Sequence, residues 1–199
     1  QGYVHVHTKD SDGDSTVLEM AQAVRARGGK YLTITDHSRS AGYARGLDED
    51  RLKAQWEAIA AAQEQVPEVR ILRGSEVDIL EDGRPDFPDA ILEQLDVVVA
   101  SVHSRFKLDE EAMTRRLLAT LDNPHVHILG HLSGRLLSKR PAYAFRLEPV
   151  LEKAAAKGVA IEINGNPERL DLSADNARAA VAKGVKLVVT SDAHTQACL

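Results

Sequence analysis

Several residue types are scarce in this sequence, and each scarcity excludes a class of protein. A single cysteine, Cys198, excludes an internal disulfide framework and is typical of a reducing compartment. No apolar run approaches the roughly 18–20 residues that a membrane span needs. The first residues show no basic stretch followed by an apolar one, so no signal peptide is visible. We therefore expect a cytoplasmic protein with no membrane partner.

The sequence also lacks an excess of positive charge. Lysine and arginine number 25 against 30 aspartates and glutamates, which gives a net charge of −5. A protein that binds nucleic acid through a broad basic face usually shows the opposite balance. A phosphate-containing substrate would therefore need a local anchor, either a few arginines or bound metal ions. The eight histidines favour metal ions.

The 199 residues, of which 43% are apolar, are typical of one globular domain, and we assign residues 1–199 to it. Short apolar runs alternate with helical patterns, which predicts parallel strands joined by crossover helices. The predicted strands are Tyr3–His7, Tyr31–Thr35, Arg70–Ile79, Val97–His103, Val126–Gly130, Val159–Ile163 and Lys186–Thr190. The predicted helices are Thr16–Arg27, Asp48–Gln65, Pro88–Gln94, Asp109–Leu121, Leu147–Lys157 and Ser173–Lys183.

An open sheet and a closed barrel both suit this alternation, and the polar residues decide between them. Histidines or carboxylates follow six of the seven predicted strands. A barrel brings all its strand ends to one mouth, whereas an open sheet gathers ligand groups at one switch point. We therefore predict an α/β TIM-like barrel of seven strands. Because Leu199 follows the seventh strand closely, we expect the closing C-terminal helix to be missing from this chain.

Residues of metal-binding type recur at these strand ends. His5 and His7 alternate along the first strand and share a face, and Asp192 and His194 repeat that spacing after the last strand. The other candidates are Asp12, His37, Glu76, His103 and His131. Imidazole and carboxylate ligands suit zinc, manganese and iron. The candidates exceed the four ligands of one tetrahedral ion, so we expect two or three divalent ions with a bridging carboxylate such as Glu76. Clustered divalent ions are suited to phosphate ester hydrolysis.

Other polar residues receive different interpretations. His125 and His127 begin the fifth predicted strand, so we expect them at the opposite rim from His131. Asp78 is expected to orient a ligand rather than to bind metal. Arg105, Arg135 and Arg169 each follow a strand end closely and are candidates for substrate phosphate contacts.

These motifs, in this order, resemble the PHP (polymerase and histidinol phosphatase) family. They are His5-Val6-His7, Ser11-Asp12-Gly13, Thr35-Asp36-His37, Gly74-Ser75-Glu76-Val77-Asp78, Ser101-Val102-His103, Gly130-His131 and Ser191-Asp192-Ala193-His194. Several stretches look most like the C-terminal PHP domain of bacterial family X DNA polymerases. They include Arg70–Leu80, Asp122–Val126 and Glu162–Leu172. Leu132-Ser133 departs from the Pro-Thr usual in that group.

The resemblance implies a distorted seven-stranded barrel with a trinuclear site, and a manganese-dependent 3′–5′ exonuclease or related DNA phosphoesterase in repair. The nine candidates named above carry over as ligands, and none is substituted. We assign catalysis to Glu76, His103 and Asp192, through a metal-bridged hydroxide. The implied partners are single-stranded or gapped DNA 3′ ends and polymerase domains of the same parent chain, in the bacterial cytoplasm or nucleoid.

Two alternatives stay open. One is a small-molecule phosphatase of the same family, such as one acting on histidinol phosphate. The other is a non-catalytic, metal-stabilised module that supports an attached polymerase, which the intact ligand set argues against.

Overall fold

Strands and helices alternate along the chain in the predicted order, in a computed structural model that describes residues 1–199. The strands are β1 (Gly2–Tyr3), β2 (Tyr31–Ile34), β3 (Arg70–Asp78), β4 (Val97–Ser101), β5 (Ile128–Leu129), β6 (Ala160–Asn164) and β7 (Leu187–Thr190). The α-helices are α1 (Val17–Ala26), α2 (Glu49–Gln65), α3 (Asp89–Leu92), α4 (Glu110–Thr120), α5 (Leu147–Lys157) and α6 (Ala174–Ala182). Two short 3₁₀ helices, η1 (Gly42–Ala44) and η2 (Gln196–Cys198), were not predicted.

The strands follow one another in chain order, from β1 to β7, in a seven-stranded sheet. Their pairs are parallel, with Tyr31 opposite Arg70, Val99 opposite Ile128 and Ile161 opposite Leu187. Sequential parallel strands joined by helices define the α/β, TIM-like barrel class, which confirms the predicted fold class.

Local sequence signals explain several helix boundaries. The hydroxyl of Thr16 accepts a hydrogen bond from the backbone N–H of Glu19, and the Glu19 carboxylate accepts one from the Thr16 N–H, which makes a capping box at the start of α1. Within α1, Val17, Met20 and Val24 are buried at spacings of three and four residues. Their burial holds the helix to the strands because one face of it is continuously apolar.

The first and fifth strands are shorter than predicted. The first was expected over Tyr3–His7, but β1 ends at Tyr3, and Val6 forms only a single bridge with Ala193. The backbone there pairs with the segment before His194, and on its other side the carbonyl of Val6 accepts the N–H of Thr35 at 2.8 Å. The fifth strand spans only Ile128–Leu129, because the chain turns sharply at His131, where φ is +22°.

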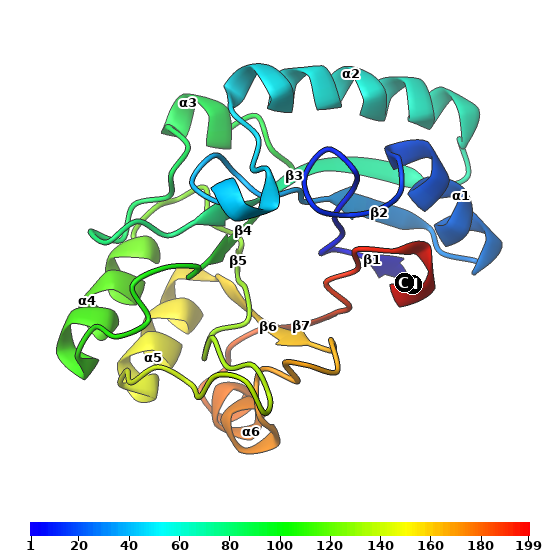
Figure 1. Ribbon diagram of the computed structural model, residues 1–199. Coiled ribbons are helices and arrows are strands. Elements are labelled where there is room, and N and C mark those ends of the chain that lie inside the picture. Colours follow the sequence, from blue (N-terminus) through cyan, green and yellow to red (C-terminus); the bar gives the residue numbers. More distant parts are fainter. The chain divides into compact units, whose positions relative to one another are not determined.

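The chain divides into two compact units. The first comprises Gln1–Glu76, Phe87–Val98 and Ser191–Leu199, and the second comprises Val77–Asp86 and Val99–Thr190. In the first unit, α1 packs against β2 and α2 (Figure 1). In the second unit, α4 packs against α5, and α5 against β6.

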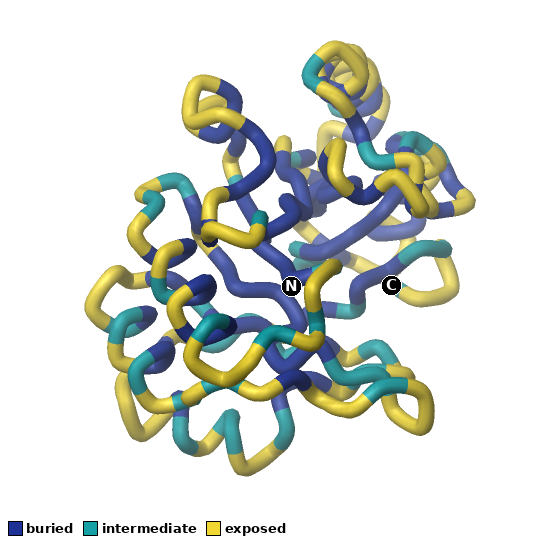
Figure 2. The backbone as a smooth tube through the Cα atoms, turned by 60° about the vertical axis from the view of Figure 1, so that its left-hand side comes forward, coloured by how far each residue is buried: buried dark blue, intermediate teal, exposed yellow.

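Both units have an apolar core. In the first unit Met20, Leu32 and Ile34 are fully buried, and in the second Met113 and Leu117 are. Along the tube in Figure 2, the strand segments are mostly buried, and the helices alternate between buried and exposed positions. None of the helices combines the length and the apolar composition needed to cross a membrane.

Candidate metal centre

The N-terminal segment and the segment after β7 lie together in the first unit. The His7 N–H donates to the carbonyl of Ala193 at 2.8 Å, and the Ala193 N–H donates to the carbonyl of His5 at 3.1 Å. This pairing places both histidines against Asp192, whose Oδ1 lies 3.4 Å from His5 Nε2 and 3.1 Å from His7 Nε2. His5 and His7 are fully buried.

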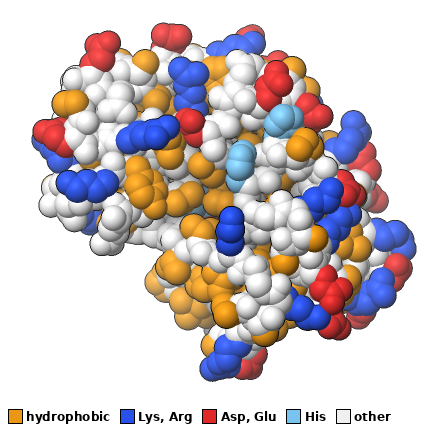
Figure 3. Space-filling model, turned by 180° about the vertical axis from the view of Figure 1, so that it is seen from behind, with side chains coloured by type: hydrophobic (Ala, Val, Ile, Leu, Met, Phe, Trp, Pro, Cys, Tyr) orange, Lys and Arg blue, Asp and Glu red, His pale blue; other side chains and the backbone are white.

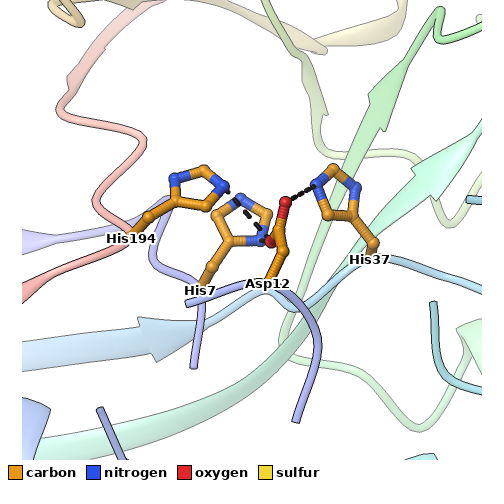
Figure 4. Close-up of side chains that lie close together, drawn as sticks. All are labelled: His7, Asp12, His37 and His194. Carbon is orange, nitrogen blue, oxygen red and sulfur yellow. Dashed lines mark ion pairs between the residues drawn. The ribbon is translucent and has the colours of Figure 1, made fainter. Parts of the chain in front are cut away.

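A second group of ligand atoms surrounds the carboxylate of Asp12 (Figure 4). Asp12 Oδ1 lies 3.3 Å from His194 Nε2 and 3.7 Å from His7 Nδ1, and Asp12 Oδ2 lies 3.6 Å from His37 Nε2. The ring of His7 stacks on that of His194 at 4.1 Å. One ligand atom from each of these four residues lies within 4.8 Å of the others.

Glu76 lies between these two groups, within the first unit. Its Oε2 is 3.4 Å from His5 Nε2, 3.5 Å from His7 Nε2 and 3.0 Å from His37 Nδ1. It lies on β3, and its N–H donates to the carbonyls of Thr35 and Asp36, the two residues before His37. A buried carboxylate oxygen against three imidazoles has the position that a bridging metal ligand requires.

The donor geometry in this unit fits metal ions. Bonds of about 2.1 Å in tetrahedral geometry separate neighbouring ligand atoms by about 3.4 Å, and the nitrogen–oxygen distances above cluster around that value. Both ring nitrogens of His7 are buried, 3.7 Å from Asp12 Oδ1 and 3.1 Å from Asp192 Oδ1, and neither makes a well-aligned hydrogen bond. A buried polar atom left in that condition is costly, and coordination to an ion removes the cost.

The charges in the site shift several pKa values. Burial raises the pKa of Asp12, but contact with His194 and the charges of His37 and His7 lower it to about 2. For His194, burial lowers the pKa, but the carboxylates of Asp12 and Asp192 raise it to about 9. Burial likewise opposes ionisation of Asp192, yet the charges of His5 and His7 hold its pKa well below the usual value. In the metal-free protein, protons therefore occupy part of the site that metal ions would take.

Asp36 orients the loop that carries Asp12. Its carboxylate is buried and accepts hydrogen bonds from the Thr8 N–H at 2.7 Å, the Thr8 hydroxyl at 2.6 Å and the Gln55 amide at 2.6 Å. The hydroxyl of Ser11 also donates to it. Burial raises the pKa of Asp36, against the hydrogen bonds and the charge of His7, which lower it. Asp36 therefore holds this loop through hydrogen bonds, while its neighbour His37 is the predicted metal ligand.

The remaining predicted ligands, His103 and His131, lie in the second unit. Their ring centroids are 5.2 Å apart, and Asp78 Oδ1 is 2.6 Å from His103 Nδ1. This contact fits the expectation that Asp78 orients a ligand. The structure thus gathers seven of the nine predicted ligands in the first unit and the other two in the second. That all nine residues bind metal ions in one centre stays a prediction.

Sequence reasoning missed Glu162, which is fully buried in β6. Its Oε2 accepts the His131 N–H at 2.5 Å, and its Oε1 accepts the Thr190 hydroxyl at 2.6 Å. Asn164 donates to Oε2 at 3.3 Å. The available signal was a single glutamate within the apolar run Val159–Ile163. Glu162 fixes the backbone of His131 and ties the end of β7 to β6.

The predicted arginines and the fifth-strand histidines have distinct surroundings. Arg105 is exposed and lies 3.2 Å from Glu81. Arg135 donates to the backbone carbonyls of Arg169 and Leu170, so its guanidinium holds two loops of the second unit together. Arg169 is half-buried. His127 is exposed directly before β5, whereas His131 follows that strand and is buried. Substrate contact by the three arginines stays a prediction.

The sequential parallel strands and the histidine–carboxylate clusters define a class of metal-dependent hydrolase built on an α/β barrel. The family model described as "PHP domain" matches residues 4–166. The chain belongs to the PHP family, and it is a metal-dependent phosphoesterase of the PHP type with a site for divalent ions.

Relatives with assigned names fall into two groups. The chain is 41% identical, over 98% of its length, to "DNA polymerase/3'-5' exonuclease PolX" of Bacillus subtilis, and it spans about a third (34%) of that protein. It is 34% identical, over 96% of its length, to a protein named "Probable phosphatase" from Thermoanaerobacter sp. and covers 77% of it.

A solved structure supports the fold. It is the structure of histidinol phosphate phosphatase from Lactococcus lactis complexed with zinc, L-histidinol and phosphate. The match covers 98% of this chain and 87% of the Lactococcus chain. The TM-score is 0.66 at 20% sequence identity, so the likeness concerns the fold alone.

Proposed function

We propose that this domain hydrolyses phosphodiester or phosphomonoester bonds at DNA 3′ ends, as a 3′–5′ exonuclease-type enzyme of DNA repair. The observation that carries the proposal is the Glu76 carboxylate, which contacts three imidazoles between two ligand groups. The identity with PolX, whose name includes a 3′–5′ exonuclease, favours DNA as the substrate. In this proposal the domain works beside polymerase domains of one parent chain, in the bacterial cytoplasm or nucleoid.

The histidine and carboxylate ligands would hold two or three divalent ions, manganese, zinc or iron(II), which would supply a nucleophile at neutral pH and neutralise phosphate charge. The chain's own residues hold and order this site. Glu76 and Asp192 provide buried carboxylates between imidazoles, and Asp78 fixes the ring orientation of His103. We assign catalysis to Glu76, His103 and Asp192, and we assign metal binding to the nine predicted ligands.

The charge distribution favours local rather than extended contact with DNA. On the face drawn in Figure 3, basic and acidic side chains are interspersed, with no extended basic area. In this proposal the metal ions, once bound, would hold the substrate phosphate together with single arginines. Arg105, Arg135 and Arg169 are the candidates for this contact, and each has other interactions: Arg105 lies 3.2 Å from Glu81, and Arg135 donates to two backbone carbonyls.

One assay tests the proposal directly. The purified chain and manganese are incubated with 3′-end-labelled DNA, single-stranded or gapped, and separately with histidinol phosphate. The proposal is supported if the wild-type chain releases labelled nucleotide and a folded Glu76→Ala variant does not. Turnover of histidinol phosphate with intact DNA rejects it.

That second result would favour a small-molecule phosphatase. The Thermoanaerobacter relative named as a phosphatase supports this candidate, because the chain covers 77% of its length. Both candidates use the same metal centre, so they differ only in what binds beside it.

A further inference from the structure

The loop from Ser38 to Leu47 carries an exposed aromatic side chain next to the metal centre. Tyr43 lies in η1 and is 71% exposed. Its ring centroid is 6.1 Å from that of the predicted ligand His37, with the two ring planes inclined at 60°. A single exposed aromatic is ordinary on a protein surface. Its position beside a metal ligand sets Tyr43 apart from the other exposed apolar side chains.

Backbone hydrogen bonds hold the loop at its ends and in its interior. The Leu47 N–H donates to the carbonyl of His37 at 2.7 Å, so the loop closes on the ligand itself. The N–H groups of Ala44 and Gly46 both donate to the carbonyl of Ala41, at 2.9 and 3.0 Å. A side chain at Gly46 would collide with the carbonyl oxygen of Ser38, so only glycine allows this closure.

A second set of contacts ties this loop to the one that carries Asp12. The guanidinium of Arg51 donates to the carbonyls of Arg45, at 2.8 Å, and Asp10. The guanidinium of Arg45 donates to the carbonyl of Lys9 at 3.2 Å. Three side chains of the loop itself, Ala41, Ala44 and Leu47, are buried, each 2% exposed or less. Tyr43 is therefore presented to solvent on a backbone that is already ordered.

The metal centre is partly exposed to solvent at two of its residues. The side chains of Asp12 and His194 are each 32% exposed, whereas His5, His7 and Glu76 are 1% exposed or less. The exposed residues Arg39 and Arg45 add positive charge to the loop that carries Tyr43. An anionic group bound at the centre would thus lie near an aromatic ring, on a loop that also carries two exposed arginines.

We infer that Tyr43 is a stacking surface for a nucleobase, namely the base of the terminal nucleotide whose 5′ phosphate binds at the metal centre. The inference rests on the proposed function and specifies its substrate class, a deoxynucleotide. In a nucleotide, one sugar separates the base from its 5′ phosphate. With the phosphate at the metal centre, the base would therefore lie beside the ligands, where the Tyr43 ring is. Aromatic side chains stack on any base, so this arrangement tolerates every sequence.

Binding measured by calorimetry tests this without relying on catalysis. The manganese-loaded chain is titrated with deoxyadenosine 5′-monophosphate and with 2-deoxyribose 5-phosphate, which lacks the base. We expect the nucleotide to bind about tenfold more tightly. Tyr43→Leu should abolish that preference, and Tyr43→Phe should keep it to within about twofold, because the ring rather than the hydroxyl provides the stacking.

Tyr31→Leu is a matched control. Tyr31 is also exposed, but it lies at the start of β2, at the opposite end of that strand from His37, so the preference should persist. Equal affinity of the wild-type chain for the two compounds, no binding of the nucleotide, or a preference that survives Tyr43→Leu would each overturn the inference.

The DNA assay separates this inference from the proposed function. If DNA stays intact but the nucleotide still binds more tightly than 2-deoxyribose 5-phosphate, the exonuclease is rejected and the stacking surface is kept. If DNA is hydrolysed but the two compounds bind equally, the stacking surface alone is rejected.

Discussion

At the scale of single residues, Glu76 is the side chain on which the metal centre depends most. Its Oε2 contacts imidazoles of both ligand groups. Glu76→Ala should therefore lower metal affinity and hydrolytic rate by at least about 100-fold, since removal of even an outer-shell partner typically costs 10- to 100-fold. Metal content by mass spectrometry and the initial rate measure the two effects.

His127→Ala is the matched control for that variant. His127 is exposed before β5 and is not among the predicted ligands, so its metal content and rate should stay near wild type. Loss of an ion from His127→Ala would show that the position of β5 relative to the ligands is wrong.

Glu162 should matter for stability as well as for the position of His131. Glu162→Ala removes the acceptor of the His131 N–H and the Thr190 hydroxyl in a fully buried place. We expect a loss of about 2–4 kcal/mol in the free energy of unfolding. Glu162→Gln should recover at least about half, because its amide oxygen still accepts the His131 N–H and the Thr190 hydroxyl can turn to accept a bond.

Urea denaturation of the metal-free protein measures these changes. Glu168→Gln provides the comparison, because Glu168 pairs with Lys139 at the surface and should contribute less than about 1 kcal/mol. Equal effects of Glu162→Ala and Glu168→Gln would contradict the assigned role of Glu162.

At the scale of elements, the start of α1 offers a test of local sequence signals. The capping box of Thr16 and Glu19 satisfies two backbone N–H groups that the helix itself leaves open. Thr16→Ala should destabilise the protein by about 1 kcal/mol, and Thr16→Ser should have little effect. Urea denaturation distinguishes the two variants, and an unchanged midpoint in Thr16→Ala would mean that packing of α1 alone sets its boundary.

At the scale of the whole molecule, pH and metal ions should act on stability through the same residues. The folded-state pKa of His194, about 9, exceeds its ordinary value of 6.5. Its stabilising contribution is therefore complete below pH 6.5 and disappears as the pH rises through 9. Asp12 has a lowered pKa of about 2, so its contribution is present above 3.8 and is lost only as the pH falls through 2.

From the contributions of His194 and Asp12, the metal-free protein should lose thermal stability between pH 6.5 and 9. Manganese competes with protons for the imidazoles, so its stabilising effect should grow over the same interval. Thermal melts with and without manganese measure both trends. A metal-free decline that is just as steep in His194→Gln would show that another group causes it.

Much of this molecule can be predicted from the sequence, because the relevant signals are local. Periodicity and end signals place the helices, and α5 spans the predicted residues Leu147–Lys157. Position after an apolar run marks His37 and His131 as strand-end residues, and alternation places His5 and His7 on one face. Exposure of His127 also agrees with its predicted place at the start of a strand.

Only the tertiary structure shows which side chains meet and which are used in support. Asp36 turns to Thr8 and Gln55 while its neighbour His37 faces the ligands, and Glu162 bonds to residues 31 and 28 positions away in the chain. Such contacts depend on long-range pairing between strands and loops, which no local pattern encodes. The sequence therefore determines the residue types and their order around the site, whereas folding decides their distances, their hydrogen bonds and the pKa values that follow from them.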